Sequence, residues 1–315
     1  MQLIRYTKEL EGDWNGFVAT AKNGTFMTSR RYMDYHSDRF EDCSVMFVEK
    51  ERVFAVFPAN VSGQTIYSHQ GLTYGGLVMG NEINAARVLE AFGLLREFYV
   101  HEYGAEKLLY KSIPYIYQQQ ASGEDEYGLY RNGARLVACG ISSAVNLRCP
   151  IAYERSRRNA LKKAAKNGLS VEPSTDYAGY WTILNDVLGK RHGQVPVHSA
   201  QELELLAGRF PENIKLFVVR GDEGSIIAGT YIYIYNNGVP AQYMAATDAS
   251  RHTGALDLLV DYLIQTYSPT HQYLDFGIST EDQGRWLNEG LIYQKEGFGG
   301  RGVCYNQYEL SLIHQ

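Results

Sequence analysis

The sequence predicts an α/β (α+β) protein with two tandem domains, each built on a mixed central sheet flanked by helices. Segments rich in β-branched and aromatic residues alternate with segments whose apolar residues recur at helical spacing. The same order of elements also occurs twice: strands, a long helix, a strand, a short helix and a strand appear before residue 150 and again from Lys215 to Leu312. Such a repeat is typical of two copies of one α/β unit. We therefore expect domains at residues 1–150 and 151–315.

The composition is that of a globular protein with a packed core. Of the 315 residues, 45% are hydrophobic and 21% are charged, which suits one large or two medium domains. The net charge of -5 argues against a DNA partner. No apolar run is long enough to span a membrane, and the first residues lack a signal-peptide pattern. We expect a cytoplasmic protein without a membrane span.

The cysteines indicate neither a disulfide framework nor a metal site. They are widely scattered, and no pair has the spacing of zinc ligands. We expect them to be reduced thiols, and we expect no bound metal. The four residues are Cys43, Cys139, Cys149 and Cys304.

The first half contains one clear helix among several strands. Apolar residues recur every three to four positions from Asn81 to Tyr103, and Gly104 is suited to end that helix. A helical entry is expected within Met1–Arg39. The other expected elements are strands at Ser44–Glu49, Val53–Asn60, Gln64–His69, Lys107–Ile113 and Arg135–Leu147, and a short helix at Glu124–Asn132.

A glycine-rich segment, Ser68–Leu77, lies between the strands and the long helix of the first half. Its glycines allow the backbone to approach a ligand closely, which would make the segment a binding loop. They are equally suited to a strand with a bulge that packs against the second domain. Both interpretations remain open from the sequence.

A basic segment, Tyr153–Gly168, lies between the two halves and is expected to be helical. Four cations fall on one face at helical spacing, and Leu161 and Ala165 fall on another. The face is either a solvated side of an amphipathic helix or an anchor for phosphate groups. The four cations are Arg155, Arg158, Lys162 and Lys166.

A loop with two histidines, Lys190–Ser199, follows an expected helix at Asp176–Arg191. Ser199 and Glu202 have the spacing of a capping box, so a further helix should begin there. His198 would then lie near a helix start, as a candidate base or as a surface residue. A metal is not expected at His192 and His198, because no third ligand is near.

The stretch Ile226–Gly277 predicts a strand, a hairpin at Asn236–Gly238, a second strand at Ala241–Thr247, a helix and a short strand. The helix opens at Gly254 directly after a strand, which is a candidate anion site because the first amides of a helix lack partners. Arg251 lies beside it. The alternative is that Gly254 only makes a turn and Arg251 is solvated.

The spacing of Arg251 and Gly254 before a helix resembles the acyl-CoA loop of the GNAT acyltransferases: Arg or Gln, two residues, Gly, one residue, then Gly or Ala. Leu256 stands where that family has Gly or Ala. The segments Tyr273–Gly277 and Lys295–Gly300 resemble the FemAB-like branch, which carries two GNAT-type domains in tandem. The resemblance implies a degenerate first domain on the acceptor side and a second domain that binds the acyl donor.

The resemblance also implies where the donor, acetyl-CoA or another acyl-CoA, would bind. The pantetheine chain would lie along the end of the second strand, and the pyrophosphate would lie at the helix start. The expected donor-binding residues are Ala245, Ala246, Thr247, Arg251, Gly254 and Ala255.

Acyl transfer to an amine needs a polarised donor carbonyl, a neutral amine and a stabilised leaving thiolate. Asp275, at a strand end, and Glu281 just beyond it are candidate bases, although Asp275 could instead cap a turn. His198 is a second candidate base. Tyr243 and Tyr293 are candidate proton donors to the thiolate.

The function expected from this resemblance is N-acylation of a small-molecule amine, such as an amino sugar or a cell-envelope precursor. One alternative is a Fem-like transferase that uses aminoacyl-tRNA. The acidic charge and the absence of a coiled-coil arm count against a tRNA partner. The other alternative is a catalytically silent binding protein of the same fold.

Overall fold

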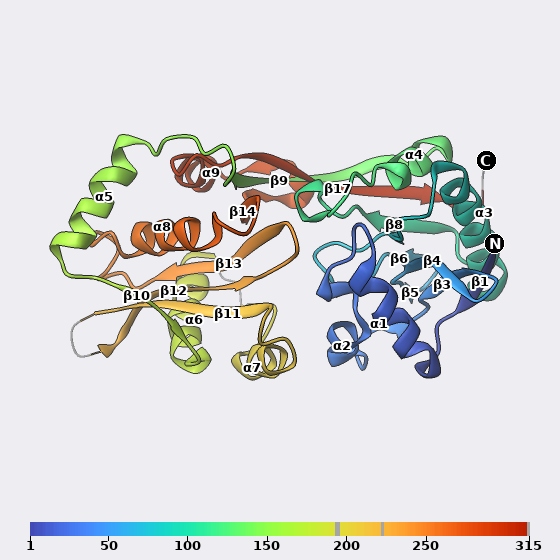
Figure 1. Cartoon of the computed structure of the whole chain (residues 1–315), viewed down its shortest axis with the longest axis horizontal. Coiled ribbons are helices and arrows are strands. Elements are labelled where there is room, and N and C mark those ends of the chain that lie inside the picture. Colours follow the sequence, from blue (N-terminus) through green and yellow to red (C-terminus); the bar gives the residue numbers. More distant parts are fainter. Residues whose placement is uncertain (193–195, 222–223, 314–315) are drawn as a thin grey trace. The chain divides into compact units, whose positions relative to one another are not determined.

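The structure is a computed structural model that describes residues 1–192, 196–221 and 224–313. It divides into two compact units, which are described separately (Figure 1). Unit 1 comprises Met1–Ile141, Thr280–Trp286 and Cys304–Gln315, and unit 2 comprises Ser142–Ser279 and Leu287–Val303. Two segments after the expected boundary near residue 150 therefore belong to the first unit. A single cut along the chain does not separate the two units.

Unit 1 has two larger sets of strands, besides the two-stranded pair β15-β16. One is an antiparallel sheet in the order β1-β3-β4-β7, and the other runs β17-β8-β6-β5-β2. Strands β9 and β17 have residues in both units. The strands are β1 (Gln2–Arg5), β2 (Glu41–Asp42), β3 (Val45–Glu49), β4 (Arg52–Phe57), β5 (Asn60–Ser62), β6 (Thr65–Tyr67), β7 (Val78–Met79), β8 (Lys107–Lys111), β9 (Arg135–Asn146), β15 (Thr280–Glu281), β16 (Trp286–Leu287) and β17 (Arg301–Ser311).

The helices of unit 1 cover a core of aromatic and aliphatic side chains. Helix α3 begins after Asn84, whose side chain accepts a hydrogen bond from the Arg87 amide, and ends at Gly104 in the left-handed conformation. Its buried face packs on Phe47, Phe57 and Tyr110. The helices are α1 (Glu11–Thr20), α2 (Arg30–Met33), α3 (Ala85–Tyr103) and α4 (Glu124–Arg131).

Strand β1 lies within the stretch that was expected to be a helical entry. Gln2–Arg5 pairs with Val45–Val48 across the sheet. This pairing joins residues far apart in the sequence, and four residues are too few for a periodic signal. The expected helix around Trp14 and Val18 is confirmed as α1, and both side chains are buried.

Unit 2 carries the strand order β10-β11-β12-β13-β14-β9. Neighbouring strands are antiparallel, except that β13 and β14 are parallel. Helices α8 and α6 lie on opposite faces of these strands (Figure 1). The elements are β10 (Val171–Ser174), β11 (Ile214–Arg220), β12 (Ile226–Tyr233), β13 (Gly238–Ala246), β14 (Tyr273–Ile278), α5 (Arg155–Lys166), α6 (Tyr177–His192), α7 (Ala200–Arg209), α8 (Ala255–Tyr267) and α9 (Glu289–Glu296).

Local signals in the second half are confirmed. The turn at 234–237 joins β12 to β13 as the Asn-Asn-Gly sequence predicted. Ser199 and Glu202 form both hydrogen bonds of a capping box at the start of α7. Helix α8 buries Leu259, Leu263 and other apolar residues in the main core of unit 2.

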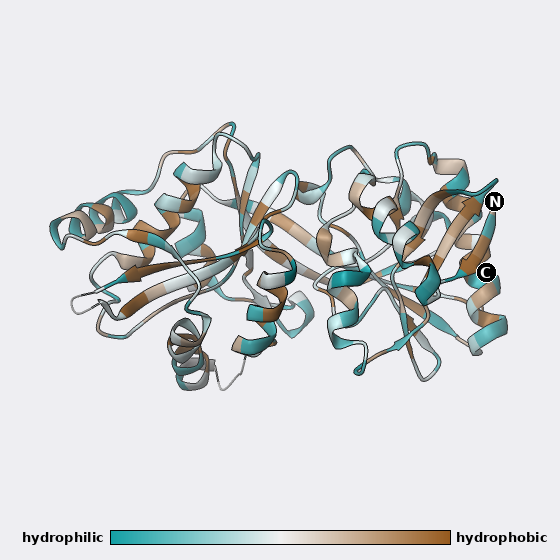
Figure 2. Cartoon of the chain, turned by 60° about the horizontal axis from the view of Figure 1, so that its bottom comes forward, coloured by the Kyte–Doolittle hydropathy of each residue, from teal (hydrophilic) through white to brown (hydrophobic). Residues whose placement is uncertain are grey.

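Helix α5 is largely hydrophilic (Figure 2), and its four expected cations, Arg155, Arg158, Lys162 and Lys166, are all exposed. Ala164 is its one fully buried residue. Ala165, which was expected on the apolar face, is exposed instead, because the helix contacts α8 through Ala160 and Ala164.

Within the described ranges, no helix combines the length and apolar character needed to cross a membrane. This part of the chain also holds no cluster of three His, Cys, Asp or Glu side chains that could bind a metal ion. The four cysteines are free thiols, and Cys43 is buried.

Candidate functional site

The central parallel strands of unit 2 separate partway along their length. Strands β13 and β14 pair at three positions, Gly238 with Tyr273, Val239 with Leu274 and Pro240 with Asp275. Beyond the last pair, β13 continues against β12, and β14 continues against β9. The remainder of β13 therefore has an edge that β14 does not cover.

Strand β13 contains a bulge along this uncovered edge. The pairing with β12 passes from Gln242 directly to Ala245, and it skips Tyr243 and Met244. Tyr243 has a φ of 44°, which is unusual for a residue with a side chain. The bulge lies on the strand along whose end the resemblance placed the pantetheine chain.

Two hydroxyl groups hold the carbonyls at the bulge. The Tyr180 hydroxyl, from α6, donates to the Tyr243 carbonyl, and Thr230 Oγ1, from β12, donates to the Gln242 carbonyl at 2.7 Å. Tyr180 and Thr230 are both fully buried. The unusual backbone is therefore stabilised by specific buried contacts.

Ala245 and Ala246 are buried on opposite faces of the sheet. Ala245 lies opposite Gly229, over which the Tyr180 ring packs, whereas Ala246 lies opposite Ala228 in the core beneath α8. Residues directly opposite each other on neighbouring strands point to the same face. Both methyl groups thus pack within unit 2, and any contact with a ligand here would come from the strand backbone.

The turn from β13 to α8 is fixed by hydroxyl groups. Ser250 Oγ donates to the Ile227 carbonyl at 2.8 Å, and Thr247 Oγ1 donates to Ser250 Oγ at 2.9 Å. Thr253 Oγ1 donates to the Ser250 carbonyl at 2.6 Å. Four of the expected donor-binding residues, Thr247, Arg251, Gly254 and Ala255, therefore lie in this hydrogen-bonded turn and at the helix start that follows it.

Gly254 packs closely against α5. Its φ is 88°, and a Cβ placed on it would lie 2.2 Å from the Ala160 carbonyl oxygen. The glycine is required both by its backbone conformation and by this close approach of two helices. The side on which a side chain would project is filled by α5, which favours the structural interpretation of this glycine.

The start of α8 already carries a negative charge. Asp257, in the first turn, is bound by Arg157 of α5 at 2.9 Å. The Ala255 amide donates to Thr253 Oγ1 at 3.3 Å. Arg251, the expected phosphate ligand, is exposed and lies 3.4 Å from the Asp248 carboxylate.

Asp275 lies in the interior of unit 2. Its side chain is 0% exposed and accepts a short hydrogen bond from Ser142 Oγ of β9. The sequence offered a base or a structural role for this residue. The contact with Ser142 and the burial fit the structural role better.

Lys295 was missed as a candidate, although its segment carried part of the resemblance. Its side chain is 3% exposed. The ammonium donates to the Gly277 and Ile278 carbonyls at 2.7 and 3.0 Å and to Ser279 Oγ at 2.8 Å. Burial lowers the pKa of Lys295 to about 8, and the Asp275 charge partly opposes this shift. The sequence signal that could have indicated this residue is a lysine two positions before a segment rich in glycine and phenylalanine, Gly297–Gly300.

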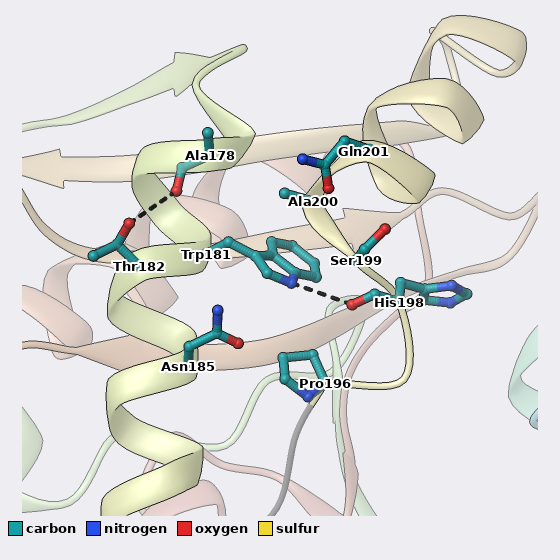
Figure 3. A pocket seen from close by; sticks show the side chains of 9 residues that line it. All are labelled: Ala178, Trp181, Thr182, Asn185, Pro196, His198, Ser199, Ala200 and Gln201. Atoms are coloured by element: carbon teal, nitrogen blue, oxygen red, sulfur yellow. Dashed lines mark hydrogen bonds between the residues drawn. The ribbon is translucent and has the colours of Figure 1, made fainter.

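His198 lines a pocket of about 450 Å³ between α6 and the start of α7. The Trp181 indole nitrogen donates to the His198 carbonyl at 3.2 Å, while the imidazole points away from the indole (Figure 3). Gly193–Val195, part of the expected histidine loop, lie outside the described residues. The other residues around the pocket are Ala178, Thr182, Asn185, Pro196, Ser199, Ala200 and Gln201.

Aromatic contacts connect this pocket to the bulge. Trp181 stacks on Tyr231 with ring centroids 5.8 Å apart, and Tyr231 lies 6.3 Å from the Tyr243 ring. Tyr243 is half-buried. The structure thus brings the pocket and Tyr243 to the same side of unit 2. Glu281 is exposed on β15 of unit 1, and Tyr293 is exposed on α9.

The glycine-rich segment of unit 1 packs tightly. A Cβ on Gly75 would lie 1.9 Å from the Ser68 carbonyl oxygen, and one on Gly71 would lie 2.4 Å from His36 Nε2. These contacts show that Ser68–Leu77 packs closely within unit 1; the expected packing against the second domain stays a prediction. Two titratable groups in or beside the segment have pKa values lowered by burial. The pKa of His69 falls to about 3, and that of Lys111 falls to about 8.

Unit 2 matches the architecture expected of an acyltransferase. Its parallel central strands separate beside a bulge, and the helix that follows begins at Gly254. The acetyltransferase (GNAT) domain family matches residues 154–284. No curated protein sequence matches the chain significantly. The expected GNAT resemblance is confirmed over residues 154–284, and this match supports an acyltransferase. The tandem fold expected from the FemAB-like branch is shared with the solved structures described next.

Three solved structures share this fold at low sequence identity. FemX has a TM-score of 0.70 at 13% identity, covering 98% of this chain and 97% of FemX. L-PGS from Bacillus licheniformis has a TM-score of 0.58 at 14% identity, covering 87% of this chain and 85% of L-PGS. A tandem GNAT protein from the clavulanic acid biosynthesis pathway has a TM-score of 0.51 at 14% identity, covering 100% and 99%.

Proposed function

We propose that the protein is an N-acyltransferase that moves an acyl group from acyl-CoA, with acetyl-CoA as the first donor to test, to an amine. The observation that carries the proposal is the uncovered edge of β13 with its bulge at Tyr243 and Met244. Peptide amides that do not pair with a neighbouring strand can donate to the carbonyl oxygen of a thioester. The GNAT domain supports a CoA thioester as the donor.

In this proposal the amine acceptor enters by the pocket beside Trp181. The described side chains around the pocket include two amides, two hydroxyl-bearing residues and one histidine, and none of the described ones is a carboxylate. They suit an uncharged polar acceptor such as an amino sugar, which could also be a cell-envelope precursor. Of the two candidate bases in unit 2, His198 is more accessible than Asp275, which is fully buried.

The remaining steps follow from the chemistry of acyl transfer. A neutral amine attacks the thioester carbonyl, the C–S bond breaks, and the amine nitrogen loses a proton to His198 or to water. The CoA thiolate leaves and takes up a proton, for which the Tyr243 hydroxyl is the proposed donor. The half-buried position of Tyr243 beside the bulge supports this role.

Calorimetric titration with acetyl-CoA tests the donor. We expect micromolar binding that weakens about tenfold in Arg251→Ala, if this exposed guanidinium contacts the pyrophosphate. Arg220→Ala is the matched control, because Arg220 also forms an exposed ion pair in unit 2, with Glu172. Absence of binding to acetyl-CoA and longer acyl-CoAs would reject the donor.

A second candidate is transfer from aminoacyl-tRNA, and two observations favour it. Asp257 places a carboxylate, paired with Arg157, in the first turn of α8 beside the proposed pyrophosphate position, and the cations of α5 are exposed. Under this alternative, Lys162→Glu with Lys166→Glu should weaken tRNA binding at least tenfold without changing the melting temperature. Equal tRNA binding by the wild-type protein and the double variant would reject aminoacyl-tRNA as the donor.

A further inference from the structure

Tyr180 of α6 links the pocket beside Trp181 to the bulge of β13, two features that the family resemblance did not connect. Tyr180 is 0% exposed, and its hydroxyl donates to the Tyr243 carbonyl. Its ring lies edge-on to Trp181, with centroids 5.7 Å apart and planes at 80°. A helix that contributes to the acceptor pocket therefore also contacts the backbone of the proposed donor site.

The Tyr180 ring has a defined place because β12 leaves room for it. A Cβ on Gly229 would lie 2.7 Å from Tyr180 Cδ2. Gly229 pairs with Ala245, the first residue after the bulge. The glycine thus lets the ring approach the sheet closely enough for the hydroxyl to reach the Tyr243 carbonyl.

The Tyr180 hydroxyl is the donor in this contact, and its surroundings favour the protonated form. Burial raises the pKa of Tyr180 far above its usual value, and the neighbouring Tyr243 adds to this effect. The phenol therefore stays protonated, and the carbonyl of Tyr243 remains its acceptor. A neutral donor fixed in the interior costs no proton transfer during a reaction.

The contact with Tyr180 also fixes the direction of the Met244 N–H, because this amide shares a planar peptide bond with the Tyr243 carbonyl. Because a trans peptide is planar, its C=O and N–H groups point to opposite sides, and the structure has no cis peptide bonds in the described residues. The carbonyl points to Tyr180, so the Met244 N–H points away from α6. The bulge leaves this amide outside the pairing with β12.

We propose that Tyr180 is a positioning residue of the acyl site, which holds the Tyr243 carbonyl so that the Met244 N–H can donate to the carbonyl oxygen of a bound acyl group. This inference rests on the proposed function for the identity of the ligand. The orientation of the bulge itself does not depend on it. Tyr180 does not touch the acyl group in this arrangement.

The test compares Tyr180→Phe, which removes only the hydroxyl, with Tyr177→Phe as the matched control. Tyr177 lies on the same helix and is 7% exposed. Acetyl-CoA and CoA are titrated separately, because only acetyl-CoA has the carbonyl. We expect Tyr180→Phe to weaken acetyl-CoA binding about fivefold, the worth of one hydrogen bond, and to leave CoA binding unchanged.

A second measurement follows the Met244 amide by nuclear magnetic resonance. Tyr180→Phe should shift its resonance and speed its hydrogen exchange at least fivefold, whereas Tyr177→Phe should do neither. An unchanged Met244 amide, or an equal loss of CoA and acetyl-CoA affinity, would overturn the inference. If the wild-type protein binds neither ligand, the acyl-CoA donor is rejected, and the Met244 amide alone decides whether Tyr180 positions the bulge.

Discussion

Arg157 of α5 and Asp257 in the first turn of α8 form an ion pair with 2.9 Å between the guanidinium and the carboxylate. Burial raises the pKa of Asp257, and Arg157 opposes that shift. A carboxylate at the start of a helix is stabilised by the unpaired amides and the helix dipole. The first turn of α8, beside the position proposed for a cofactor pyrophosphate, therefore already holds a carboxylate, whose charge Arg157 balances.

Asp257→Asn is expected to tighten acetyl-CoA binding about fivefold, because it removes a like charge beside the proposed pyrophosphate position. Calorimetric titration measures the change. Asp261→Asn is the matched control: Asp261 also lies on α8, and it accepts a hydrogen bond from Tyr153 at 2.9 Å. Unchanged or weaker binding in Asp257→Asn would place the pyrophosphate away from the start of α8.

Gly254→Ala is expected to destabilise unit 2 more than Gly168→Ala does. Both glycines have positive φ, 88° and 63°, so each alanine should cost about 1 kcal/mol in backbone strain. A Cβ at Gly168 would meet nothing within 4 Å, whereas one at Gly254 would meet the Ala160 carbonyl. We expect about 2 kcal/mol more for Gly254→Ala, measured by urea unfolding. Equal losses would mean that α5 moves aside freely.

Asp125 should make unit 1 less stable as the pH rises. Its carboxyl is buried, accepts a hydrogen bond from Tyr110 at 2.6 Å, and has a pKa raised from 3.8 to about 6, mainly by burial. Between these values the folded protein binds more protons than the unfolded chain. The free energy of unfolding should therefore fall as the pH rises from 4 to 6, by up to about 3 kcal/mol.

Asp125→Asn removes this titration, so the pH dependence of its unfolding free energy should be flatter than that of the wild type over the same range. Urea unfolding at several pH values measures both slopes. Glu126→Gln, at the exposed neighbouring position, is the control and should keep the wild-type slope. Parallel slopes for Asp125→Asn and the wild type would contradict the prediction.

Lys295→Met is expected to destabilise unit 2 by about 3 kcal/mol, because it leaves the Gly277 and Ile278 carbonyls and the Ser279 hydroxyl without their buried donor. Lys166→Met, at an exposed position of α5, should have little effect. Chemical unfolding at neutral pH measures both variants. A loss no larger than that of Lys166→Met would mean that water replaces the ammonium.

The Lys295 titration gives an independent pH test. Its pKa is lowered from 10.5 to about 8 by burial, so between these values the unfolded chain binds more protons than the folded protein. The free energy of unfolding should rise with pH from 8 to 10.5 in the wild type relative to Lys295→Met. A constant difference between the two proteins over this range would show that Lys295 keeps its ordinary pKa.

Contacts between residues close in the sequence were predictable. The Asn236–Gly238 turn, the Ser199–Glu202 capping box and the stripe of α8 each follow from local backbone preferences or from a helical repeat. The resemblance in Arg251–Gly254 also indicated the acyltransferase fold, because such a turn and helix start carry their own residue requirements.

Contacts between distant residues were decided only by the tertiary structure. The pairing of β1, the Tyr180 contact with Tyr243 and the burial of Lys295 join segments that no local pattern connects. Gly254 shows the difference most clearly. The sequence indicated that this glycine begins a helix, but only the structure shows that a side chain here would collide with the Ala160 carbonyl of another helix. By itself the sequence determined the fold class and most of the longer elements, because periodicity and turn chemistry are local. The chemical surroundings of each site residue depended on how those elements pack.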